Sequence, residues 1–163
     1  MLLTENELKP FIKKIEKGNK LDEKGKHQEA IKIYLDTWDE LPEPKLEQPE
    51  SIANWIMNCI VNCYIDLKDF LNAKTWAKKA LDTERAKDPI NFYEHFQMGV
   101  VYFELNEHDK AMEYFETVYQ RAQKRGFQEF DKKYWKFYSE NKLLLARVSR
   151  RVPLFYLLPF FKN

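Results

Sequence analysis

The sequence predicts an all-α fold, a solenoid of three helical hairpins followed by a C-terminal capping helix and an apolar tail. The 163 residues include only four glycines and are rich in Lys, Glu, Leu and Ala, a composition that favours helices over strands. Apolar residues make up 44% of the chain, enough for the core of a single domain. An internal repeat at the length of a helical hairpin is the third observation.

The repeat emerges when three stretches are aligned on one alanine each. The aligned alanines are Ala30, Ala73 and Ala111. The residues twelve before them are Gly18, Val61 and Gly99, those nine before are Leu21, Tyr64 and Tyr102, and those four after are Tyr34, Ala77 and Phe115. A small residue midway along the first helix of a hairpin should face a small residue midway along the second, so that the axes approach and large neighbours fill the groove.

The repeat and the helical spacing of apolar residues set the expected elements in chain order. They are a first hairpin at 11–42, a linker at 43–50, a second hairpin at 51–88, a third at 89–125, a capping helix at 127–152 and an apolar tail at 153–163. The first residues become acidic at once, which is unlike a signal peptide, and two cysteines are too few for a disulfide framework. We therefore expect a cytoplasmic protein.

These offsets resemble the tetratricopeptide repeat, W-x2-L-G-x2-Y…A-x3-F…P. The third unit fits best, with Gly99, Tyr102, Ala111 and Phe115 at the repeat positions and His95 in place of the tryptophan. The resemblance implies a non-catalytic protein-binding module, in which the first helix of each hairpin lines a concave groove. Carried over to this chain, the groove residues are Asn19, Asp22, Glu23, Trp55, Asn58, Asn62, Asp66, Tyr93, Phe96, Val100 and Glu104.

The chemistry of this groove favours a basic or neutral protein ligand. Asn58 and Asn62 lie one helical turn apart and could grip a peptide backbone through their amides. All charged groove residues are acidic, and Trp55, Tyr93 and Phe96 are large apolar anchors of the kind that dominate interfaces. The alternative is that the aromatic residues pack between repeats and the acids are simply solvated.

A narrower resemblance concerns the stretches AIKIYLDTWDELPEPK, VYFELNEHDKAMEYF and FDKKYWKFYSE. They are similar to small stand-alone bacterial tetratricopeptide proteins associated with toxins. This resemblance implies an immunity or accessory protein that masks a toxin, and an acidic groove would steer a cationic toxin into place. A secretion or folding chaperone that holds an extended client is the alternative.

Charge is distributed unevenly along the chain. From Arg121 onward there are 11 Lys/Arg and three Asp/Glu, whereas the preceding residues hold 16 and 23. The candidate basic surface consists of Lys132, Lys133, Lys136, Arg147, Arg150 and Arg151. Such a surface could bind nucleic acid or an anionic membrane, and the tail Val152–Phe161 could contact a surface or form a homodimer. We favour cap packing with solvated charges, and hence neither nucleic acid nor membrane as the main partner.

The sequence contains no phosphate-binding, metalloprotease or nucleophile motif, so we expect no enzyme and no cofactor. Cys59 and Cys63 lie one turn apart, but zinc requires four ligands or three and a water. The closest histidine, His27, belongs to another unit. We therefore expect both cysteines to pack in the interior and no metal site. A metal or cofactor at this pair would indicate an enzyme instead.

Overall fold

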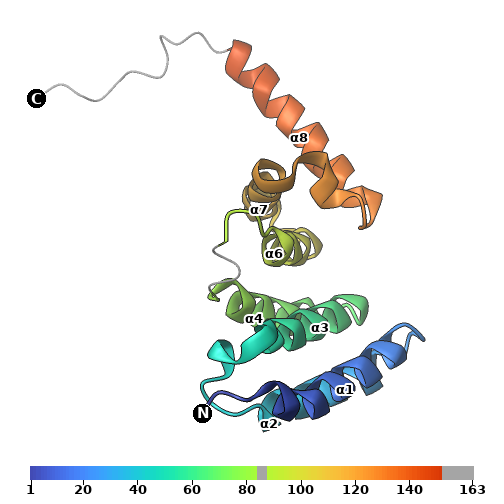
Figure 1. The fold of residues 1–163 in the computed structure, drawn as a ribbon. Helices are drawn as coiled ribbons and strands as arrows, with labels where there is room; N and C mark the ends of the chain where they lie inside the picture. Colours follow the sequence, from blue (N-terminus) through green and yellow to red (C-terminus); the bar gives the residue numbers. More distant parts are fainter. Residues whose placement is uncertain (84–87, 152–163) are drawn as a thin grey trace, which may run out of the picture. The chain divides into compact units, whose positions relative to one another are not determined.

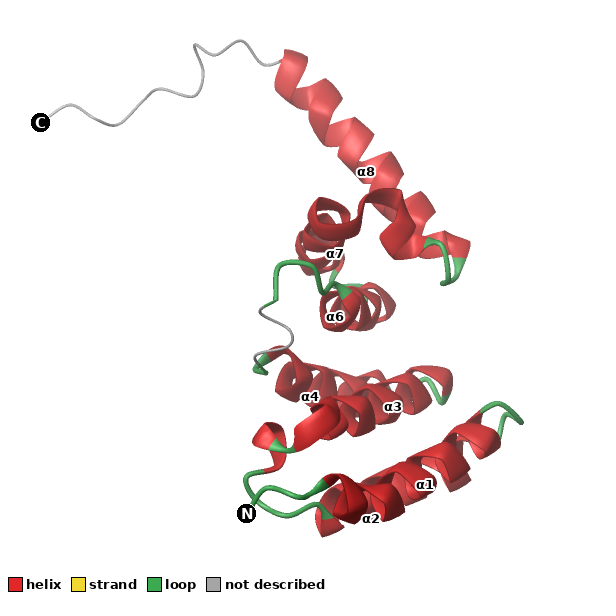
Figure 2. Cartoon of the chain, in the orientation of Figure 1, coloured by secondary structure: helices red, strands yellow, loops and turns green. Residues whose placement is uncertain are grey.

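A computed structural model describes residues 1–83 and 88–151, with side chains up to residue 144. The described residues form helices and no strand, which confirms the all-α prediction (Figures 1 and 2). They belong to two compact units, residues 1–126 and 127–163. Within the described part of the chain, no helix combines the length and the apolar character that crossing a bilayer requires.

The first unit consists of antiparallel helix pairs that pack in succession. The pairs are α1 (Glu5–Asp22) with α2 (His27–Glu40), α3 (Ile52–Asp66) with α4 (Phe70–Leu81), and α6 (Tyr93–Glu104) with α7 (His108–Ala122). The second helix of each hairpin also packs against the first helix of the next, α2 on α3 and α4 on α6. This is the predicted solenoid of three hairpins.

The three hairpin turns have the same backbone geometry. Each contains one residue with positive φ, Gly25, Lys68 or Asn106, five residues before the aligned alanine. In each turn, the next N–H donates back to the carbonyl of the repeat position nine before that alanine, Leu21, Tyr64 or Tyr102, at 2.8–2.9 Å. These bonds satisfy carbonyls that the end of a helix would otherwise leave unpaired.

The connection between the first two hairpins is held by Gln48. It lies between two short 3-10 helices, η1 (Lys45–Glu47) and η2 (Pro49–Ser51), and its side chain is buried. The Leu3 N–H donates to its Oε1 at 2.9 Å, and its Nε2 donates to the carbonyls of Met1 and Pro42. The N-terminal residues are thereby joined to the linker.

The packing inside each hairpin differs from the expectation in one respect. Gly18 does not face another small residue, because the ring of Tyr34 lies directly against it, and the ring of Phe115 lies in the same way against Gly99. Ala30, Ala73 and Ala111 are fully buried beside these pairs. The glycine therefore makes room for the aromatic residue four positions after the alanine.

In the second hairpin, the residue at the glycine position is larger and the residue at the aromatic position is smaller than in the other two hairpins. At the positions of the glycine and the aromatic residue it has Val61 and Ala77, and both are fully buried. A larger residue on the first helix thus accompanies a smaller one on the second. Because such exchanges conserve volume, the repeat tolerates a departure from its sequence pattern.

The second unit is described as far as the end of α8 (Lys132–Arg151), which the 3-10 helix η3 (Gln123–Phe127) precedes. Phe127 stacks on Tyr138 with ring centroids 5.4 Å apart and meets Trp135 edge-on at 5.3 Å. These aromatic contacts order the beginning of the predicted capping helix. The apolar tail, with the Val152–Phe161 segment proposed for a surface or a second copy, lies outside the described residues.

Candidate functional site

The predicted groove residues lie on the first helices of the hairpins, or directly after α1 in the case of Glu23, and they differ in exposure. Those accessible or half-buried are Asn19, Asp22, Glu23, Trp55, Asn62, Asp66, Tyr93 and Glu104. Those buried are Asn58, Phe96 and Val100. Only the first set is available to a partner without rearrangement of the helices.

Asn58 and Asn62 belong to a polar seam between α3 and α6. Nδ2 of Asn58 donates to Oε1 of Glu94 at 3.2 Å, and Nδ2 of Asn62 donates to Oη of Tyr93 at 2.9 Å. Nε2 of Gln97 donates to Oδ1 of Asn62 at 2.8 Å. The amides expected to grip a peptide therefore join the second hairpin to the third.

Two members of this seam, Glu94 and Gln97, were not predicted as site residues. Both are almost fully buried, which is unusual for such polar side chains. Within the described part of the chain, Oδ1 of Asn58 and Oε1 of Gln97 are buried without a hydrogen-bond partner. Their buried position could not be inferred from α6 alone, because it results from the approach of α3.

Phe96 and Val100 contribute to the interior of the third hairpin instead of an open surface. The Phe96 ring lies 5.7 Å from that of Phe115, centroid to centroid, and only 1% of Phe96 is exposed. Of the predicted apolar anchors, Trp55 is 36% exposed and Tyr93 is half-buried. Trp55 is therefore the large side chain of this set that a partner can reach most easily.

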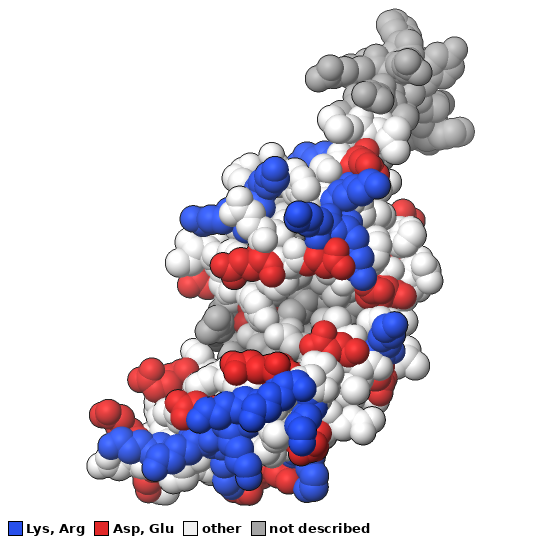
Figure 3. All heavy atoms as spheres, turned by 90° about the vertical axis from the view of Figure 1, so that its right-hand side faces the viewer, with Lys and Arg blue, Asp and Glu red and all other residues white. Residues whose placement is uncertain are grey.

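Charges on the first unit are more mixed than the groove residues suggest. Glu23 and Asp66 are exposed, and Glu104 is half-buried. On the face drawn in Figure 3, Lys and Arg side chains gather over the first hairpin with Asp and Glu among them. Exposed lysines recur at helical spacing on α1, at Lys9, Lys13, Lys17 and Lys20. The acidic character of the candidate face therefore comes mainly from the ends of the first helices.

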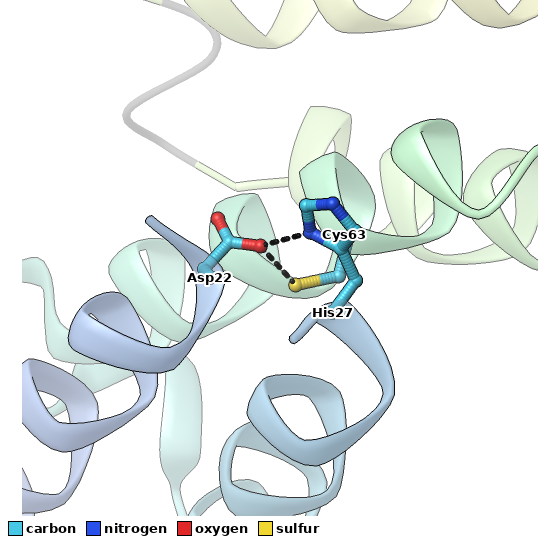
Figure 4. A group of neighbouring side chains, drawn as sticks. All are labelled: Asp22, His27 and Cys63. Carbon is cyan, nitrogen blue, oxygen red and sulfur yellow. Dashed lines mark hydrogen bonds and ion pairs between the residues drawn. The ribbon is translucent and has the colours of Figure 1, made fainter. Parts of the chain in front are cut away.

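At the end of the first hairpin's α1, three side chains from different helices converge (Figure 4). Nδ1 of His27, at the start of α2, lies 2.6 Å from Oδ1 of Asp22, and the Cys63 thiol of α3 donates to the same oxygen at 3.2 Å. Oδ2 of Asp66 lies 3.8 Å from the same imidazole nitrogen. His27 belongs to another repeat unit than Cys63, as the sequence indicates, but stacking of the hairpins brings the two residues together.

Burial shifts the pKa values in and around this cluster. It raises the pKa of the Cys63 thiol, and the hydrogen bond to Asp22 and the charge of that carboxylate raise it further. Burial also raises the pKa of Cys59 to about 11. Burial raises the pKa of Asp66 as well, although the nearby His27 acts in the opposite direction. Both thiols are therefore protonated near neutral pH.

On the second unit, the described part of the candidate basic surface is exposed. Lys132, Lys133 and Lys136 are accessible, and Nζ of Lys133 lies 5.0 Å from the ring centroid of Tyr134. Tyr134 itself is buried, so it offers no free ring face for a nucleic-acid base. The side chains of Arg147, Arg150 and Arg151 lie outside the described residues.

Comparison with known families gives one match. The family model of the tetratricopeptide repeat matches residues 95–125, which contain most of α6 and all of α7. A search of curated proteins gave no match to the chain. The matched segment is the unit in which the sequence shows the repeat positions most completely.

Proposed function

We propose that this tetratricopeptide-repeat protein binds a protein partner through α1, α3 and α6, the first helices of its three hairpins. Proteins with this fold generally bind other proteins and are not catalysts. The observation that carries this proposal is the exposure of Trp55 at the beginning of α3. Large aromatic side chains of this kind supply much of the binding energy when a partner buries them. The surrounding polar residues would then form the rim of the interface.

We propose that the partner surface is basic. Asp22, Glu23, Asp66 and Glu104 are the charged residues of the candidate face, and all four are acidic. A basic partner would be attracted by these carboxylates and would associate faster at low salt. The exposed lysines of α1 would disfavour a partner that extends over the outside of the first hairpin.

The proposal is testable with an array of peptides of equal length and with basic, neutral or acidic composition. The wild-type protein should bind the basic and neutral peptides, and Trp55→Ala should bind them more weakly by roughly tenfold, as expected for a central aromatic contact. The matched control is Leu71→Ala, which removes an exposed apolar side chain from the second helix α4. The proposed face would be contradicted if both variants lost the same affinity for the peptides, or if Trp55→Ala lost none.

We further propose that the natural partner is a folded cationic toxin, which the protein masks as an immunity or accessory protein. This identification rests on the narrower sequence resemblance and on the acidic groove residues. The test is to mix the purified protein with the product of the neighbouring gene and to measure a stoichiometric complex by size-exclusion chromatography. A chaperone would instead bind unfolded peptides of many sequences and leave the folded product free.

A further inference from the structure

The cluster of Asp22, His27 and Cys63 combines three side chains that all serve as metal ligands. A carboxylate oxygen, an imidazole nitrogen and a sulfur atom lie within 4.8 Å of one another, and each comes from a different helix. The side chains point toward one another, as Figure 4 shows. Asp66 adds a second carboxylate beside the imidazole.

The charge balance of this cluster favours a cation. Two carboxylates surround one thiol and one imidazole, and no Lys or Arg side chain among the described residues forms an ion pair with any of them. Cys63 is fully buried, whereas about a quarter of the His27 and Asp22 side chains is exposed, 26% and 28%. The group is therefore closed by protein on the sulfur side and open to solvent on the other, so that an ion has a path of entry.

We propose that Asp22, His27 and Cys63 bind a divalent transition metal, with Zn²⁺ as the best match to the donors. Sulfur, imidazole nitrogen and carboxylate oxygen are the ligands that Zn²⁺ takes in proteins, whereas Ca²⁺ and Mg²⁺ take oxygen alone. Oδ2 of Asp66 lies 3.8 Å from the His27 nitrogen, so this carboxylate would supply a fourth ligand directly or through a water. The metal site can be tested without a protein partner, although Asp22 and Asp66 also belong to the proposed partner-binding face.

The observed spacing is close to that of a zinc site. Tetrahedral zinc bonds of about 2.0–2.3 Å place neighbouring ligand atoms about 3.3–3.8 Å apart. Cys63 Sγ and Asp22 Oδ1 are 3.2 Å apart, and His27 Nδ1 and Asp66 Oδ2 are 3.8 Å apart. The pair of His27 Nδ1 and Asp22 Oδ1, at 2.6 Å, must separate by less than about 1 Å to admit the ion.

Metal binding would replace the hydrogen bonds of the cluster by coordination bonds. The Cys63 thiol loses its proton to solvent and binds as the thiolate, and His27 binds through Nδ1 and carries its proton on Nε2. The bound ion would connect the end of α1, the start of α2 and the last turn of α3. It would thus connect the first hairpin to the second and stabilise the fold by an amount that grows with the logarithm of the free metal concentration divided by the dissociation constant.

Cobalt provides a direct test, because a Co²⁺–thiolate bond has a charge-transfer absorption in the near ultraviolet. The full chain is freed of metal with a chelator and titrated with CoCl₂ alone, and bound Co²⁺ is then displaced with ZnCl₂. The wild type and the control Cys59→Ser should both show the absorption, since Cys59 lies one turn away and outside the cluster. Cys63→Ser should lose it, and His27→Gln should bind Co²⁺ roughly tenfold more weakly or worse.

A second measurement separates a lost site from a lost fold. With ZnCl₂, the midpoint of thermal unfolding should rise for the wild type and Cys59→Ser and stay constant for Cys63→Ser, with the helical circular dichroism of each variant recorded beforehand. The proposal is overturned if the wild type shows no cobalt–thiolate absorption. It is also overturned if Cys63→Ser, or His27→Gln with native helicity, binds the metal as the wild type does.

Discussion

Replacement of Gly99 by alanine tests how α6 and α7 pack in the third hairpin. A Cβ atom at Gly99 would lie 2.6 Å from Cε1 and 2.7 Å from Cδ1 of Phe115, far inside normal contact distance. The Phe115 ring is fully buried and lies against the ring of Phe96, so it has little freedom to retreat. The added methyl group therefore forces the two helices apart or the ring out of its preferred rotamer.

Two effects of opposite sign determine the result. Overpacking of a core costs about 1–3 kcal/mol. Helix propensity alone would stabilise an alanine over a glycine by about 1 kcal/mol. We expect the packing cost to equal or exceed the gain in propensity, so that the free energy of unfolding falls by up to about 2 kcal/mol and the unfolding midpoint falls by up to several degrees.

The assay is urea unfolding followed by circular dichroism, for Gly99→Ala, Phe115→Leu and the double variant. The smaller leucine should make room for the methyl group, so Gly99→Ala should cost less in the Phe115→Leu background than in the wild type. A Gly99→Ala protein that is about 1 kcal/mol more stable than the wild type, as propensity alone requires, would refute the packing argument. Equal costs in both backgrounds would show that Phe115 is not the obstacle.

Three further predictions concern buried polar groups. Burial and the nearby Arg121 lower the pKa of His95 below its usual 6.5, so the unfolded chain binds the proton more readily and stability should decrease as the pH falls below about 6.5. His95→Gln should weaken the dependence of the unfolding midpoint on pH. If the variant and the wild type show the same pH dependence, His95 is not its source. Iodoacetamide at about pH 8 should alkylate Cys59 and Cys63 only after unfolding, because Cys63 is buried, Cys59 is half-buried and both thiols are protonated. Rapid reaction of the folded chain would count against this. Gln48→Leu should lower the free energy of unfolding by about 1–3 kcal/mol, since it leaves the Leu3 N–H without its acceptor, whereas the exposed neighbour variant Glu47→Leu should change it little.

The hairpin architecture could be predicted from the sequence because the repeat positions carry the packing. The aligned alanines Ala30, Ala73 and Ala111 are all fully buried, and the turns recur at a constant offset before them. What the alignment did not show is the partner of each glycine. An aromatic ring packs against each of Gly18 and Gly99. The sequence indicates this only when two repeat positions are considered together, because the second hairpin has Val61 in place of the glycine and Ala77 in place of the aromatic residue.

The candidate site was harder to predict because it depends on contacts between hairpins. Offsets taken from the repeat place Asn58 on the first helix, but they do not show that Glu94 and Gln97 approach it from α6. For the same reason the sequence did not indicate the cluster of Asp22 and Cys63, which lie 41 residues apart. Asp22 and Cys63 lie eight and ten residues before the aligned alanines of their units, so a search for metal ligands at similar offsets in consecutive units would have found this pair. It would have missed His27, which lies three residues before Ala30.

The contacts between hairpins also bear on how the first unit could serve as a binding surface. Asn58 and Asn62 join α3 to α6 through Glu94, Tyr93 and Gln97. The proposed metal ligands join α1 and α2 to α3 at the other side of the second hairpin. Hydrogen bonds and coordination bonds are directional, whereas apolar contacts permit sliding of one helix along another. These polar contacts should therefore fix the distances between Trp55 on α3 and the exposed acidic residues on the neighbouring hairpins. Removal of the metal, or Asn62→Ala, should weaken the binding of a partner that spans two hairpins more than the binding of a short peptide held by one.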